Sequence, residues 1–102
     1  MKRLSSWGWI VLVALLAAVP LGLHYLDRWA AEAATRSGRT AVNSKDYAQA
    51  INHFNRAIEI DPKYAPAYHG RGLANLNQGD RDRAIADFDE AIRLDPNDPR
   101  PW

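Results

Sequence analysis

The chain has 102 residues, a net charge of +1 and no cysteine. The lack of cysteine excludes disulfides, thiolate metal sites and thiol nucleophiles, and the small net charge argues against general nucleic-acid binding, which requires a basic surface. The 47% of apolar residues are unevenly placed: no Asp, Glu, Lys or Arg occurs from Leu4 to Leu26, whereas all 12 acidic residues lie at or after Asp27. The chain therefore divides into an apolar N-terminus and a polar remainder.

An uncharged segment follows the basic N-terminus formed by residues 1–6. Residues 7–26, WGWIVLVALLAAVPLGLHYL, form 20 consecutive positions without a formal charge. At a rise of about 1.5 Å per residue they make roughly 30 Å of helix, the thickness of the hydrocarbon core of a bilayer. Trp7 and Trp9 flank the segment on one side and Tyr25 and Trp29 on the other, as in the aromatic belts of membrane proteins. We predict a transmembrane helix, or signal anchor, over residues 7–29.

A cleaved signal peptide is the alternative interpretation, because a basic start before an apolar run has that form. The run is longer than the roughly 7–15 residues usual in such peptides, and a cut after Val19 would leave Pro20 at the new N-terminus. A cut after Ala33, at Ala31-Glu32-Ala33, has suitable small residues but lies beyond Asp27 and Arg28. We prefer the uncleaved anchor. Lys2 and Arg3 favour a cytoplasmic N-terminus. We therefore expect a single-pass membrane protein whose polar part lies outside the cytoplasm, in the periplasm if the source is bacterial.

The polar remainder contains an internal repeat. A shift of 34 residues aligns residues 31–64 with residues 65–98, and 12 of the 34 positions are then identical. Such a period indicates stacked supersecondary units. In the second copy, Ala84, Ile85, Phe88, Ala91 and Ile92 recur at the spacing of one helix face. That face is too narrow to form a core alone, so the units are expected to stack.

Local signals divide each copy into two helices. Asp46 and Asp80 precede the second helices and are expected to cap them, and Gly79 suits the left-handed turn before Asp80, where the first copy has Lys45. Proline ends both second helices. We assign residues 30–64 to a degenerate first unit, residues 65–98 to a second, and residues 99–102 to the start of a third or to a tail. The helix over 30–43 is poorly apolar and is expected to continue the membrane segment or to form a loosely packed cap.

These residues carry a resemblance to the tetratricopeptide repeat family. The matching positions of the two units are Gly38, Ala50, Phe54, Ala57 and Pro62, and Tyr68, Gly72, Ala84, Phe88, Ala91 and Pro96. The resemblance implies an all-α fold in which antiparallel helix pairs form an α-solenoid of about two repeats. It also implies a non-enzymatic protein that binds a partner protein or peptide in a groove lined by the first helices of the units.

The groove-facing positions follow from the register that the resemblance supplies. They are expected at Thr35, Arg39, Asn43, His69, Leu73, Leu76 and Asn77. A clamp for C-terminal carboxylates, which some members of the family carry, is not supported by the residue types at these positions.

No pattern in the sequence indicates a catalytic or metal site. His24, His53 and His69 lie on different predicted elements without a metal-ligand partner four residues away. The acidic residues around Asp80–Glu90 lack the spacing and the central glycine of a calcium loop. No serine has an apparent histidine base, and no glycine-rich phosphate loop is present. We predict no enzyme activity, no cofactor and no metal.

The leading hypothesis is a membrane-anchored adaptor or scaffold that binds a partner protein. One alternative is a self-associating structural protein, a homo-oligomer whose open ends pair between chains with Trp102 in the contact. A second is a secreted soluble repeat protein, if the leader is cleaved.

Overall fold

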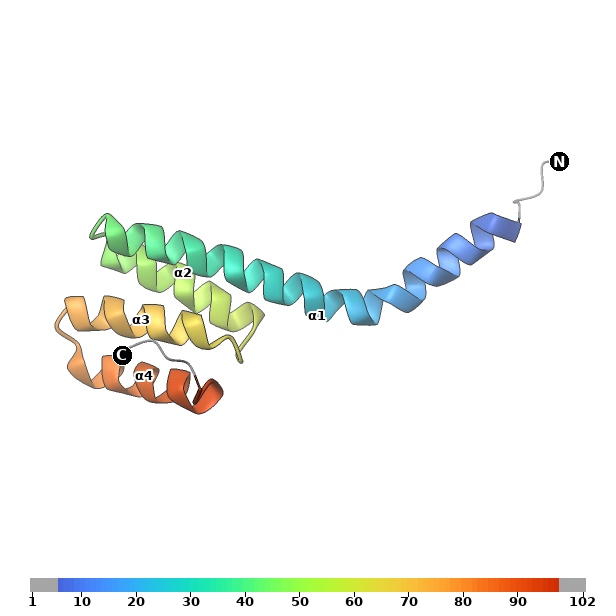
Figure 1. The fold of residues 1–102 in the computed structure, drawn as a ribbon. Coiled ribbons are helices and arrows are strands. Elements are labelled where there is room, and N and C mark those ends of the chain that lie inside the picture. The colour runs from blue at the N-terminus through green and yellow to red at the C-terminus, as the bar shows by residue number, and fades with distance from the viewer. Residues whose placement is uncertain (1–5, 98–102) are drawn as a thin grey trace.

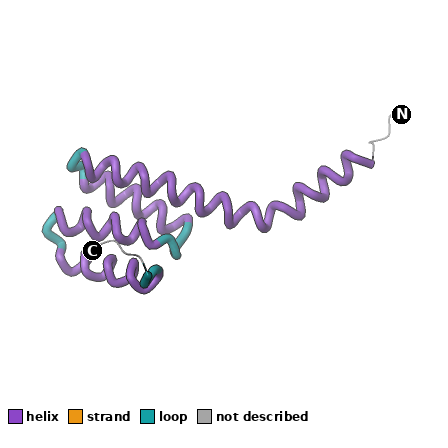
Figure 2. Tube along the Cα trace, in the orientation of Figure 1, coloured by secondary structure: helices purple, strands orange, loops and turns teal. Residues whose placement is uncertain are grey.

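The computed structural model contains four helices in the part of the chain that it describes, which comprises residues 6–97 without the side chains of residues 6, 7, 11 and 14–25. The helices are α1 (Ser6–Asn43), α2 (Tyr47–Ile60), α3 (Ala65–Asn77) and α4 (Arg81–Leu94). Residues 6–97 contain no strand, so this part of the chain is all-α as predicted (Figures 1 and 2).

The helices pack as two antiparallel pairs (Figure 1). The C-terminal part of α1 packs on α2, and α3 packs on α4. Helix α3 joins the pairs, because it contacts both α2 and α1, whereas α4 contacts neither of these two helices. The N-terminal half of α1 projects away from this four-helix domain, so the described chain is elongated, with extents of 69 × 28 × 19 Å.

The predicted caps and turns are present. The Asp46 carboxylate accepts a hydrogen bond from the Gln49 backbone N–H at 3.3 Å, and Asp80 accepts one from the Arg83 N–H at 3.2 Å, so each satisfies a free donor at a helix start. The turns before them have left-handed backbone at Lys45 (φ 60°) and Gly79 (φ 84°). Only the glycine adopts this conformation without steric strain.

Phe54 occupies the centre of the domain. Its side chain is fully buried, and it lies so close to two backbones that a Cβ atom added at Gly38 or Gly70 would come within 2.6 or 2.4 Å of the ring. Glycine at both positions therefore lets α1 and α3 approach the ring from α2. Buried alanines of all four helices complete the close packing: Ala31, Ala50, Ala57, Ala65, Ala67, Ala74, Ala84 and Ala91.

The helix over residues 30–43 is the C-terminal part of α1, so it continues the N-terminal segment as expected. It is not loosely packed, since Ala31, Thr35 and Gly38 are buried. On the surface of α4, Arg93 forms an ion pair with Glu90, because residues three apart share one face of a helix.

Two predictions concern the ends of the chain. The basic segment over 1–6, apart from Ser6, and the third unit over 99–102 lie outside the described residues. Among the residues that are described, no helix is both long enough and apolar enough to cross a membrane. The transmembrane helix over 7–29 stays a prediction.

Candidate protein-binding groove

A groove of about 390 Å³ lies between the first helices of the two units. Helices α1 and α3 form its walls, and α2 contributes its base. The lining residues are Arg39, Val42 and Asn43 from α1, Phe54 from α2, and His69, Gly70 and Leu73 from α3. Four of the seven predicted groove residues, Arg39, Asn43, His69 and Leu73, are therefore brought together.

Helical spacing explains why these side chains meet. Arg39 and Asn43 are four residues apart, as are His69 and Leu73, so each pair projects from one face of its helix. Gly70 brings α3 close to the Phe54 ring, which places the two pairs on either side of that ring. The groove is thus a consequence of the same close packing that forms the core.

The chemistry of the groove is apolar with a positive charge at its edge. Val42 and Leu73 supply partly exposed apolar surface above the buried Phe54 ring, and none of the lining residues is acidic. The Arg39 side chain is exposed, and no ion pair within residues 6–97 involves it. The His69 ring lies 5.8 Å from the Phe88 ring, between centroids. This combination suits an apolar side chain that has a carboxylate nearby.

The other three predicted residues do not line the groove. Thr35 is only 1% exposed, because this part of α1 packs into the domain, and its hydroxyl has no hydrogen-bond partner among the described residues. The Asn77 side-chain amide donates a hydrogen bond to the Leu73 backbone carbonyl at 2.8 Å, so it is engaged with the backbone at the C-terminal end of α3. Leu76 is 46% exposed but lies outside the groove. Whether these three positions contact a partner stays a prediction.

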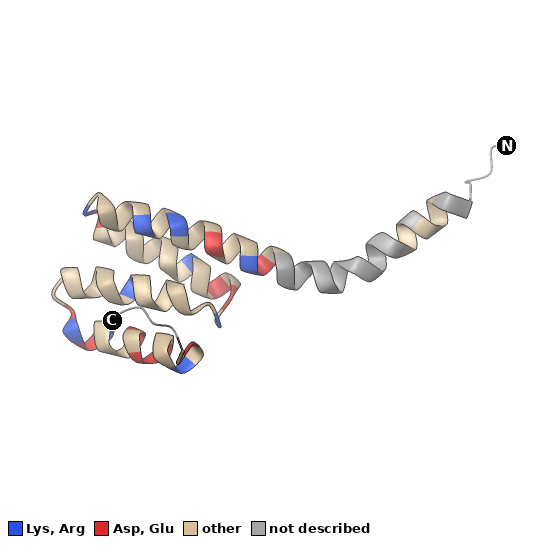
Figure 3. Ribbon diagram, in the orientation of Figure 1, with Lys and Arg blue, Asp and Glu red and all other residues tan. Residues whose placement is uncertain are grey.

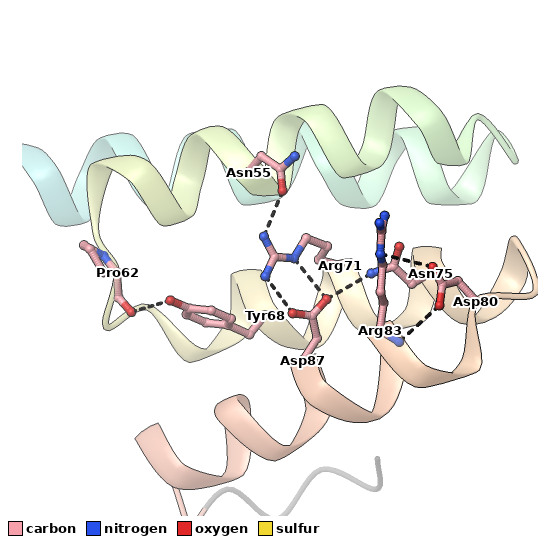
Figure 4. A network of polar contacts seen from close by, with 8 residues as sticks. All are labelled: Asn55, Pro62, Tyr68, Arg71, Asn75, Asp80, Arg83 and Asp87. Carbon is pink, nitrogen blue, oxygen red and sulfur yellow. Dashed lines mark hydrogen bonds and ion pairs between the residues drawn. The ribbon is translucent and has the colours of Figure 1, made fainter.

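A polar network that the sequence did not reveal joins α2, α3 and α4 (Figure 4). Arg71 on α3 binds both carboxylate oxygens of Asp87 on α4, through Nε at 3.0 Å and Nη2 at 2.7 Å. Its Nη1 donates to the Asn55 side chain on α2 at 2.9 Å, and Asn75 donates to Asp87 at 3.0 Å. The Asp87 side chain is 7% exposed and that of Arg71 is 26% exposed.

One hydrogen bond of the network crosses between the two units, from Arg71 on α3 to Asn55 on α2, whereas the contacts of Asp87 with Arg71 and Asn75 lie within the second unit. A bidentate arginine–carboxylate pair also fixes orientation, and the neighbouring amides satisfy the remaining polar atoms. The sequence contains one indication of this network. Asp87 lies three residues after Ala84 and four before Ala91, so it falls on the apolar face of α4, where a buried acidic side chain requires a partner.

Tyr68 extends this network toward the loop before α3. Its hydroxyl donates to the Pro62 carbonyl at 2.8 Å, and its ring lies 5.6 Å from the Arg71 guanidinium. Partial burial, followed by the negative charge of Glu90, raises the pKa of the Tyr68 hydroxyl above its ordinary value. These contacts stabilise the domain, and they lie apart from the groove.

Comparison with known proteins agrees with this architecture. A sequence model described as Tetratricopeptide repeat matches residues 35–99, which is more than half of the chain. The chain belongs to the tetratricopeptide repeat family. Repeats of this family generally mediate protein–protein interactions and are typically not enzymes. Comparison with curated proteins gives no match.

Proposed function

We propose that this protein is a non-enzymatic adaptor that binds a segment of a partner protein in the groove between α1 and α3. One observation carries the proposal: Arg39, Asn43, His69 and Leu73 come from two helices and converge over the Phe54 ring. An exposed concave surface with apolar walls and few polar groups is the usual form of a binding site.

The favoured ligand is a peptide segment with an apolar side chain next to an acidic one. The apolar side chain would pack between Val42 and Leu73, and the acidic one would face Arg39. Full burial of one apolar side chain contributes about 1.5–3 kcal/mol, and an exposed ion pair at most about 1 kcal/mol. Micromolar affinity corresponds to about 8 kcal/mol, so these two contacts alone give weak binding.

Tethering at a membrane would offset this weakness, because confinement raises the effective concentration of a partner at the same surface. We propose that residues 7–29 form this tether, with the N-terminus in the cytoplasm and the repeats outside it. The described side chains at Trp9, Ile10, Leu12 and Val13 support the proposal, since all four are large, apolar and exposed, as an anchor requires.

A continuous helix would connect the tether to the groove. Helix α1 runs unbroken to Asn43, with Ala31 fully buried and the Arg28 guanidinium 5.0 Å from the centre of the Tyr64 ring. These contacts fix α1 on the domain just after the proposed tether, so the groove would keep a set distance from the membrane surface.

Selection from a library of short random peptides displayed on phage tests the binding proposal. The full chain in detergent micelles serves as bait, and Leu73→Ser/Arg39→Glu serves as the counter-bait. Enriched sequences should share an apolar residue near an acidic one and should not bind the double variant. Enrichment of sequences that bind both baits equally, or no enrichment at all, would refute a peptide groove at this place.

Alkaline extraction of membranes tests the tether. The intact chain should stay with the membrane pellet, and protease added outside the cytoplasm should digest the repeats. Release into the supernatant, or a mature N-terminus near Ala34, would contradict the anchor and would support the secreted soluble form. A chain with residues 7–26 replaced by a soluble helix should be released and provides the control.

A further inference from the structure

A second surface, formed by α4 and the end of α3, is left uncovered in residues 6–97. Three large apolar side chains of the four-helix domain are well exposed there: Leu76 at 46%, Ile85 at 52% and Ile92 at 41%. Ile85 and Ile92 are seven residues apart, so they share one face of α4. We call these three residues the end face.

The repeat shows what normally covers such a face. A shift of 34 residues relates the end face to Val42, Ile51 and Ile58 of the first unit. All three counterparts are partly buried. Val42 and Ile51 pack against the cluster that contains Ala74, and Ile58 packs against the cluster that contains Ala67. Both alanines belong to α3, so α3 is the helix that covers the first unit.

The contact face of α3 specifies the shape of a covering helix. Ala67, Gly70 and Ala74 are buried and lie at positions i, i+3 and i+7. Gly70 leaves no room for a side chain beside Phe54. Phe88, the counterpart of Phe54, meets Gly72 in the same way on one side but is only half-buried. A helix on the end face therefore needs small residues at the same three positions, with the smallest over Phe88.

The charge on α4 specifies the residue type at one further position of the covering helix, i+4. Arg71, at i+4 of the covering face, donates to Asn55 on α2. The counterpart of Asn55 on α4 is Asp89, which is exposed and has no ion pair within residues 6–97. Residues 65–98 carry seven acidic and four basic side chains, and several acidic ones lie on α4 (Figure 3). A basic residue at i+4 of a covering helix would meet a full negative charge here.

We propose that the end face docks an amphipathic helix of a partner protein, in the way that α3 docks on α2. The helix has small residues at i, i+3 and i+7 and an arginine or lysine at i+4, and its basic side chain pairs with Asp89. A second copy fits less well, because pairing two end faces would bring two acidic surfaces together. This surface is separate from the groove, so the two proposals can fail independently.

The chain itself supplies the probe for a test. A synthetic peptide of residues 64–78, with α-aminoisobutyrate at solvent-facing positions to stabilise the helix, carries the specified face. Its binding to the full chain in detergent micelles is measured by fluorescence anisotropy. We expect saturable binding, weakened more than about tenfold by Ile85→Glu in the protein or by replacing the peptide glycine at position 70 with leucine. Ile85 is already exposed, so the protein variant should keep its fold, which circular dichroism checks.

A charge exchange makes the assignment specific. Arg71→Glu in the peptide should weaken binding, and Asp89→Arg in the protein should restore it, whereas the groove variant Leu73→Ser should leave the affinity unchanged. Absence of binding at about 1 mM peptide, near the weak limit of useful affinity, would overturn the proposal. An affinity that neither Ile85→Glu nor the charge exchange changes would overturn it as well. A homodimer in sedimentation that Ile85→Glu dissociates would assign the face to a second copy and would also overturn it.

Discussion

Gly70→Ala gives the sharpest test of the packing, because one methyl group is added against a fully buried ring. The new Cβ would lie 2.4 Å from both Cε1 and Cζ of Phe54, whereas carbon atoms in contact are normally about 3.5–4.0 Å apart. The ring cannot retreat, since the backbone of Gly38 lies against it as well. Either Phe54 or α3 must move by about 1 Å, with consequences for both units.

The size of the expected destabilisation follows from two opposing effects. Overpacking a core by one methyl group costs about 1–3 kcal/mol, and the short distances place this site near the upper end. Replacing glycine by alanine inside a helix contributes about 1 kcal/mol in the opposite direction. We therefore expect a net loss of about 2 kcal/mol in the free energy of unfolding, which lowers the melting temperature of a domain of this size by roughly 8–16 °C.

Gly72→Ala is the matched control on the same helix. Its Cβ would lie 2.6 Å from the Phe88 ring, but that ring is only half-buried and can swing outward. Its expected loss is below about 1 kcal/mol, because the same gain in helix propensity offsets a smaller strain. Urea unfolding followed by circular dichroism compares the two variants. Equal stabilities, or a larger loss for Gly72→Ala, would refute the account of Phe54 as the closely packed centre.

Three further predictions address the turn, the polar network and pH. Lys45→Gly should stabilise the domain by about 0.5–1 kcal/mol, measured by urea unfolding, because it relieves left-handed backbone strain; an unchanged midpoint would contradict this. Asp87→Ala should cost about 2 kcal/mol, reduced from the value for fully buried pairs since Arg71 is partly exposed, and thermal unfolding that matches the wild type would refute the structural role of the network. The raised pKa of Tyr68 means that the unfolded chain loses its hydroxyl proton first. The contribution of this pKa shift to the free energy of unfolding is present below about pH 10 and is lost as the pH rises through the pKa of the folded state. The urea midpoint should therefore fall less steeply above pH 10 in Tyr68→Phe than in the wild type, and identical slopes would contradict the shift.

Features with local causes could be predicted from the sequence. The caps at Asp46 and Asp80 and the turn at Gly79 depend on a few adjacent residues, and the structure confirms them. The buried position of Phe54 followed from helical periodicity within one unit. Arg39, Asn43, His69 and Leu73 could be brought to one groove because the four-residue spacing within each helix sets their direction.

Features that depend on a neighbouring unit could not be predicted in the same way. Val42 and Leu76 are counterparts in the two units, yet Val42 is partly buried and Leu76 is exposed, because α3 covers the first unit while nothing among the described residues covers the second. A pairing between the two helices of one unit also escapes prediction: Arg71 and Asp87 are 16 positions apart, and no periodicity in the sequence specifies which basic residue reaches that carboxylate.

The affinity of a selected peptide for the wild type and two variants tests whether a partner segment binds between α1 and α3, over Phe54. The dissociation constant of one enriched peptide is measured by fluorescence anisotropy against the wild type, Leu73→Ser and the end-face variant Ile85→Ser. We expect binding to be weakened about tenfold by Leu73→Ser, through lost apolar contact, and to be unchanged by Ile85→Ser. Equal affinity for the wild type and Leu73→Ser would contradict binding at this place.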